Sequence, residues 1–231
     1  MVKNVLVFLG TLLLINTSAI AADKAFYLKA IMGGAKISSI KTIDNDINFK
    51  VIQNSRVSKT AGIGIGYYID STTRVDITFE NPRFNFIPKR GNFSFTNNLD
   101  LITGNQLIKR NANIQTLMLN AYFDLIRRGS FKIFAGGGIG TSRIKEKVTS
   151  EFKLDDSIVK GQTISIPAVI TTENKKAKNS FAYTLTIGSD IDIMKNFHLE
   201  LAYSWKHHGK VKNCNNRYEG HNMSASIRFD L

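Results

Sequence analysis

The 231-residue sequence is poor in the residues that many protein classes depend on. Its single cysteine, Cys214, cannot form an internal disulfide, and no Cys/His pair has the spacing of a zinc site. We therefore expect no metal and no cofactor, and we interpret Cys214 as a free loop thiol, with intermolecular pairing as the alternative. The three prolines lie outside every segment with a strand pattern, as expected because proline removes a hydrogen-bond donor from a sheet: Pro82, Pro88 and Pro167.

Long apolar runs are also scarce. The run from Val5 to Ile15 follows Lys3 and precedes Ala19-Ile20-Ala21, an order typical of a cleaved secretory signal peptide. The run is too short for a comfortable transmembrane helix, which makes an uncleaved anchor the weaker alternative. We predict a signal peptide at residues 1–21 and one domain at residues 22–231.

Acidic residues are outnumbered by basic ones, 18 to 31, which gives a net charge of +13. A basic balance suggests nucleic acid or an anionic surface as a partner. Beyond residue 21 the whole excess falls in four long polar connections: 38–59, 81–113, 143–178 and 206–220. This distribution argues against nucleic acid. It favours anionic partners outside the cell or lipopolysaccharide phosphates, with plainly solvated loops as the alternative.

What the sequence does contain is strict alternation of apolar and polar residues, which is typical of half-buried strands. It occurs in eight segments: 26–32, 61–69, 75–79, 117–125, 131–139, 181–187, 197–205 and 223–231. Short turns at 70–73, 127–130 and 194–196 alternate along the chain with the four long connections. The pattern predicts an all-β fold, an eight-stranded antiparallel transmembrane up-and-down β-barrel. A soluble β-sandwich is the alternative.

The two faces of the predicted strands differ in chemistry. The apolar face carries aromatic residues near its ends: Phe26, Phe123, Phe131, Phe197 and Phe229 in one girdle, with Tyr203 and Trp205 at the opposite rim. The other face carries charges that must be paired if they lie inside: Lys29, Arg74, Asp76, Glu80, Asp124, Lys132, Glu200, Arg228 and Asp230. We therefore expect a lumen filled by salt bridges, too narrow for a general porin.

Motifs for catalysis are weak. The glycine clusters at 62–66 and 136–140 lie within strand patterns, whereas a nucleotide loop needs a following helix. A hydrolase could use Ser204, His207 and Glu219, or His221 and Ser224, but no spacing marks them as a set. We predict that the protein is not an enzyme.

The mature chain resembles the small OmpA/OmpX/opacity-like outer-membrane barrel superfamily of Gram-negative bacteria. The resemblance is carried by Thr60–Tyr68, Phe131–Gly140 and Ala225–Phe229. The last strand also resembles the signal read by the barrel assembly machinery, although it ends in Leu231 where phenylalanine is usual. The loop layout and the Lys/Asn/Ile-rich composition resemble the rickettsial proteins called "putative adhesins".

This resemblance implies a cell-surface adhesin in the outer membrane, among its lipids and lipopolysaccharide. The long loops would be extracellular, and both mature termini periplasmic. Host surface or serum proteins such as vitronectin would be its ligands. We select basic pairs in the longest connections as candidate ligand contacts: Lys89, Arg90, Lys109, Arg110, Lys175 and Lys176. The alternatives are a structural envelope barrel without a specific ligand and an outer-membrane lipid or peptide hydrolase.

Overall fold

The computed structural model describes residues 26–38, 40–44, 49–97, 100–154, 157–159, 162–164, 169–211 and 216–231. The predicted signal peptide and Cys214 lie outside these ranges. No helix that is long and apolar enough to cross a membrane occurs in the described part of the chain.

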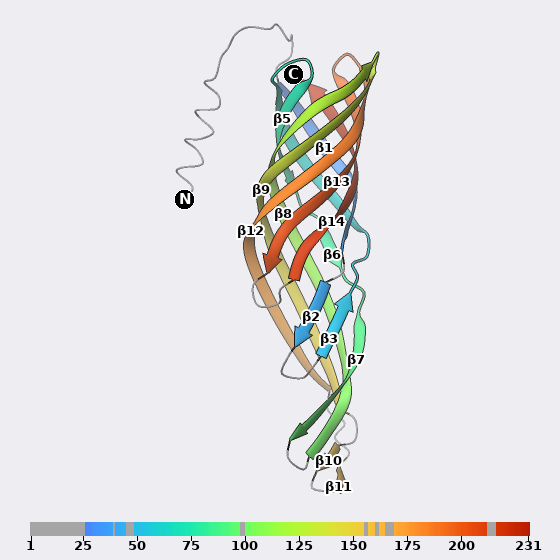
Figure 1. Ribbon diagram of the computed structural model, residues 1–231, viewed down its shortest axis with the longest axis vertical. Coiled ribbons are helices and arrows are strands. Elements are labelled where there is room, and N and C mark those ends of the chain that lie inside the picture. The colour runs from blue at the N-terminus through green and yellow to red at the C-terminus, as the bar shows by residue number, and fades with distance from the viewer. Residues whose placement is uncertain are drawn as a thin grey trace, which may run out of the picture.

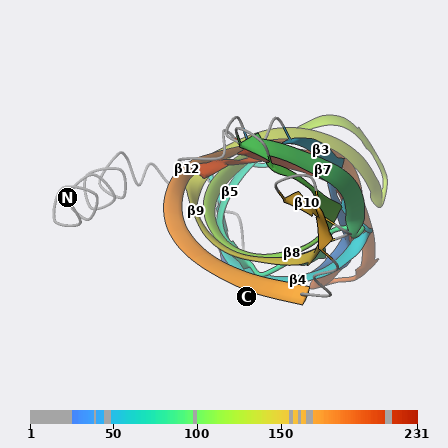
Figure 2. The same ribbon diagram turned by 90° about the horizontal axis from the view of Figure 1, so that it is seen from below.

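Eight antiparallel strands close into a ring, which Figure 2 shows along its axis. They are β1 (Phe26–Ile37), β4 (Ser58–Tyr68), β5 (Thr73–Glu80), β8 (Asp100–Arg128), β9 (Phe131–Leu154), β12 (Val169–Met194), β13 (Phe197–Val211) and β14 (Asn216–Asp230). Each strand pairs with the next along the chain, and β14 pairs with β1 to complete the ring. The predicted eight-stranded barrel is confirmed.

The two ends of the barrel are unequal (Figure 1). At the end drawn uppermost, short turns join the strands. In one of them Asp70 accepts hydrogen bonds from the backbone amides of Thr72 and Thr73, and in another Gly129 adopts a φ of 56°. The opposite end carries the short strands β2 (Ile40–Asp44), β3 (Phe49–Gln53), β6 (Arg83–Asn85), β7 (Lys89–Asn97), β10 (Ser157–Val159) and β11 (Gln162–Ile164).

Three barrel strands are much longer than their apolar segments: β8 has 29 residues, β9 has 24 and β12 has 26. Much of the connections 81–113 and 143–178, which the polar sequence predicts as loops, is therefore strand. The ladders run outward to the pairs Gly104 with Leu154 and Lys153 with Val169. We call residues 104–115, 141–154 and 169–180 of these strands the extended sheet.

The chemistry of the two faces reverses where the extended sheet begins. Along β8 the outward side chains are Leu117, Leu119 and Phe123, all exposed, whereas Lys109 and Asn111 occupy the outward positions beyond them. The interior changes in the opposite sense, from a mostly ionic network to a mostly apolar cluster beside the buried pair of Arg110 and Glu146. Its apolar cluster consists of Ala35, Ile37, Phe84, Phe86, Ala112, Ile114, Ile144 and Tyr218. The exposed apolar side chains thus form a belt around the short-turn half of the barrel, which we call the apolar band. The extended sheet stands beyond it with a largely apolar core, as in soluble proteins.

Candidate binding surface

The lumen inside the apolar band is held by a buried ionic network. Glu200 is fully buried and pairs with Lys29 at 2.6 Å, with Arg74 at 3.1 Å and with Arg228. Asp190 pairs with Arg228 at 2.8 Å. Cations contributed by β1, β5 and β14 therefore converge on carboxylates from β12 and β13, which ties opposite walls together. The predicted lumen of paired charges is confirmed.

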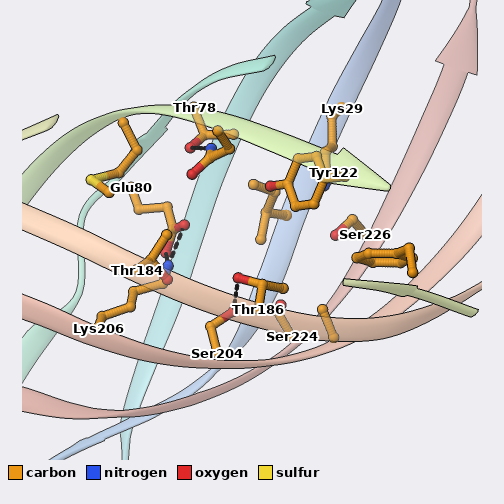
Figure 3. A pocket seen from close by; sticks show the side chains of 15 residues that line it. Lys29, Thr78, Glu80, Tyr122, Thr184, Thr186, Ser204, Lys206, Ser224 and Ser226 are labelled. Carbon is orange, nitrogen blue, oxygen red and sulfur yellow. Dashed lines mark hydrogen bonds and ion pairs between the residues drawn. The ribbon is translucent and has the colours of Figure 1, made fainter. Parts of the chain in front are cut away.

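The network leaves little empty space. Lys206 donates to Glu80 at 2.5 Å across the barrel, and Thr186 bonds with Ser204 at 2.9 Å, as Figure 3 shows. The cavity between these pairs and the ionic network around Glu200 measures about 30 Å³, which has room for only about two water molecules. A barrel this well filled serves as a rigid scaffold rather than as a wide pore.

The outer face of the band presents apolar and aromatic side chains. At the short-turn end Phe26, Phe123, Phe131 and Phe197 are all exposed, and Phe197 packs against Phe229 with ring centroids 4.8 Å apart. Tyr203 lies toward the other edge of the band and hydrogen-bonds with His221. The predicted aromatic positions on the outer face are confirmed, and such girdles suit membrane–water interfaces.

Beyond the band, the outward face of the extended sheet is basic. Lys109 pairs with Glu151 at 2.5 Å, and Lys175, with 72% of its side chain exposed, pairs with Glu173 at 2.7 Å. Glu173 also binds Lys147 at 2.8 Å, and the two lysines lower its pKa to about 2. Exposed pairs of this kind stabilise a fold very little, so these cations can turn to a ligand at small cost.

Sequence reasoning missed the most basic part of this surface, which lies on β9. Arg143 and Lys145 are exposed at successive outward positions of β9, and Lys147 follows at the third. In the described part of the chain neither Arg143 nor Lys145 has a carboxylate within ion-pair distance. Continuing the alternation of 131–139 beyond Ile139 would have placed all three on one face.

Arg110 must be removed from the candidate contacts. Only 2% of it is exposed, and its guanidinium pairs with Glu146 at 2.7 Å inside the extended sheet. Adjacent residues of a strand point to opposite faces, so Lys109 and Arg110 cannot share the outer surface. The same parity places Lys176 on the opposite side of β12 from Lys175.

The remaining candidates lie on the edge strand β7. Lys89 and Arg90 are both exposed and stand opposite Ile108 and Leu107 of β8. The structure thus brings Lys89, Arg90 and Lys109 to the same end of the barrel as Lys175. Their role as ligand contacts stays a prediction.

In both sets of the hydrolase alternative the serine and the histidine do not meet. Ser204 points into the lumen and is buried, whereas His207 points outward, stacks on Tyr183 and bonds with Glu219 at 3.4 Å. His221 also faces outward, and Ser224 lies on the other face of β14. A nucleophile and its base need direct contact, and these side chains are separated by the wall of the barrel.

Comparison with known proteins agrees with this architecture. Residues 7–230 match the family described as "Outer membrane protein beta-barrel domain". A Rickettsia conorii protein named "Putative adhesin" is 30% identical over 91% of this chain and 84% of its own. Another of that name, from Rickettsia bellii, is 30% identical over 99% of this chain and 100% of its own. The crystal structure of Neisserial surface protein A shares the fold, with a TM-score of 0.53 and 16% identity over 89% of this chain and 97% of that one.

Proposed function

The chain belongs to the outer-membrane β-barrel family, and we propose that it acts there as a surface adhesin that binds host proteins through the basic side chains of its extended end. In this proposal residues 1–21 direct export and are removed, and the barrel assembly machinery inserts the mature chain. The apolar band sits among the lipids and lipopolysaccharide of the outer membrane. The short turns and both mature termini face the periplasm.

One observation carries the proposal. The extended sheet displays exposed cations in register on a rigid frame: Lys109, Arg143, Lys145, Lys147 and Lys175. A membrane-spanning barrel does not need such a sheet for its own closure, and scaffolds with long projecting segments commonly carry function there. Relatives that are named "Putative adhesin" support the same role.

The nature of the ligand follows from the charge. Acidic surface patches on host surface or serum proteins would complement this sheet, and vitronectin is the first candidate to test. A structural envelope barrel without a specific ligand is the second candidate function, because the interior is so completely filled. A hydrolase is not favoured by any arrangement that the described side chains make.

Neutralising two exposed cations at the extended end should weaken capture of the host ligand. For the double change Lys109→Gln and Lys175→Gln we expect a Kd about tenfold higher, because each exposed charge contact contributes about 0.7 kcal/mol. The refolded chain would first be used to capture host surface and serum proteins at physiological salt. The captured protein would then be titrated against both variants.

The matched control removes two exposed cations from the other end, by Arg128→Gln and Lys195→Gln. This pair has the same change in net charge and should leave the Kd unchanged. If both double variants weaken binding equally, or if modest salt abolishes it, the binding reflects net charge alone. The structural barrel would then be the better description.

A further inference from the structure

Four ionisable side chains gather inside the short-turn end of the barrel: Asp190, Asp192, His198 and Asp230. The tight turn between Met194 and Phe197 sets the register, so that Asp192 stands opposite His198 on the neighbouring strand. Asp190 lies two residues farther along the same inward face of β12. Asp230 comes from β14, which pairs with the other edge of β13. Three adjacent strands thus contribute to one cluster.

The geometry centres on Nδ1 of His198. This atom lies 2.6 Å from Oδ1 of Asp192 and 3.9 Å from Oδ1 of Asp190. One potential ligand atom from each of the three residues falls within 4.8 Å of the other two. On the other side of the ring, Nε2 hydrogen-bonds with Oδ2 of Asp230 at 2.9 Å, and the hydroxyl of Tyr68 donates to Asp230 at 3.1 Å. The imidazole is therefore fixed with one nitrogen facing two carboxylates.

One oxygen in this cluster has no hydrogen bond. Asp190 is completely buried, and its Oδ2 accepts from Arg228 at 2.8 Å. Its Oδ1, on the side of His198, accepts none from any described residue. A buried carboxylate oxygen without a partner costs free energy unless a cation occupies the space in front of it.

The charge balance of the lumen at the short-turn end also favours a bound cation. Six carboxylates take part in its ion pairs, namely Asp76, Asp124, Asp190, Asp192, Glu200 and Asp230. Five cations that carry a permanent charge face them among the described residues: Lys29, Arg74, Arg127, Lys132 and Arg228. One carboxylate is in excess, and the unbonded oxygen of Asp190 lies where a further cation would balance it.

We propose that Asp190, Asp192 and Nδ1 of His198 bind a divalent transition-metal ion of the zinc type. Two carboxylate oxygens and one imidazole nitrogen form a ligand set that Zn²⁺ uses with water in the fourth position. Asp230 orients the histidine through its other ring nitrogen, as a carboxylate commonly does behind a metal-bound imidazole. The ammonium of Lys132, 3.0 Å from Asp192 and close to the barrel mouth, gives way to the ion. The bound ion ties β12, β13 and β14 together beside the turn.

The first test uses metal alone. The refolded chain in detergent, freed of metal with a chelator, is titrated with Co²⁺ and followed by its visible absorption, and Zn²⁺ is then added in competition. We expect one Co²⁺ per chain and its displacement by Zn²⁺. His198→Ala and Asp192→Asn should each weaken binding at least tenfold, while His221→Ala should leave it unchanged, because His221 is exposed on the outer face.

A second variant guards against misfolding. Asp230→Asn keeps all three ligands and should still weaken binding about 10-fold to 100-fold, because it replaces the carboxylate that orients His198. Folding of every variant is checked by the heat-dependent shift of the barrel on a gel. Absence of saturable Co²⁺ and Zn²⁺ binding by the folded wild-type chain would overturn the proposal. So would a folded His198→Ala variant that binds metal as the wild type does, and the cluster would then be an ion-pair network completed by Lys132.

Discussion

Replacing Glu200 with glutamine is expected to lower the free energy of unfolding by about 3–5 kcal/mol, because removing one partner from a buried ion network leaves its charges uncompensated. Glu200 is fully buried and is the shared contact of Lys29, Arg74 and Arg228, so its neutral substitute weakens three buried ion pairs at once. The measurement is urea unfolding of the chain in lipid vesicles, followed by the fluorescence of Trp205, its only tryptophan.

The control for this prediction is the exposed pair of Lys109 and Glu151 on the extended sheet. Glu151→Gln breaks an ion pair of similar length, yet it should change the free energy of unfolding by less than about 1 kcal/mol, because solvent screens both charges. Equal effects of the two substitutions would mean that the lumen network does not hold the barrel together.

Leu119→Arg is expected to lower the free energy of unfolding in vesicles by about 2–4 kcal/mol. Leu119 projects outward from β8 within the apolar band and is 41% exposed. An arginine there must face lipid near the middle of the bilayer, which carries a cost of this size. The same urea titration measures it.

Asn111→Arg is the matched control on the same strand and the same outward face. Asn111 lies in the extended sheet, beyond the point where the outward side chains of β8 change from apolar to polar, and we place it outside the bilayer. The loss in the free energy of unfolding should therefore be about 0–1 kcal/mol. A penalty as large as that of Leu119→Arg would show that the band extends farther along β8 than the side-chain pattern indicates.

The strands inside the apolar band could be predicted because each has one apolar and one polar face. The extended sheet could not, because its signal disappears in sequences such as Arg143-Ile144-Lys145-Glu146-Lys147. Only Ile144 is apolar there, and the inward positions on either side of it are Ser142 and Glu146. Polar sequence of this kind predicts a loop, yet backbone pairing with β8 and β12 holds it as strand.

Adjacent basic pairs are suitable ligand contacts in a loop but not in a strand, where neighbouring side chains point to opposite faces. Because Lys109 and Arg110 are neighbours in a strand, one of the two side chains must point inward. Arg110 is the inward one, and there it forms an ion pair with Glu146. Parity favours alternate positions instead, as at Arg143 and Lys145. The cluster around His198 could not be predicted from the sequence for another reason. Its residues come from three strands, and their proximity depends on the register at the turn and on the pairing of β14 with β13.

The proposed binding of host proteins requires that the extended end face the outside of the cell. The most direct test labels single cysteines on intact bacteria with a membrane-impermeant maleimide, in a background where Cys214 is serine. Lys109→Cys should be labelled on whole cells, whereas Lys195→Cys should be labelled only after the outer membrane is broken. The reverse pattern, with Lys195→Cys labelled on intact cells and Lys109→Cys protected, would contradict the orientation and the adhesin role with it.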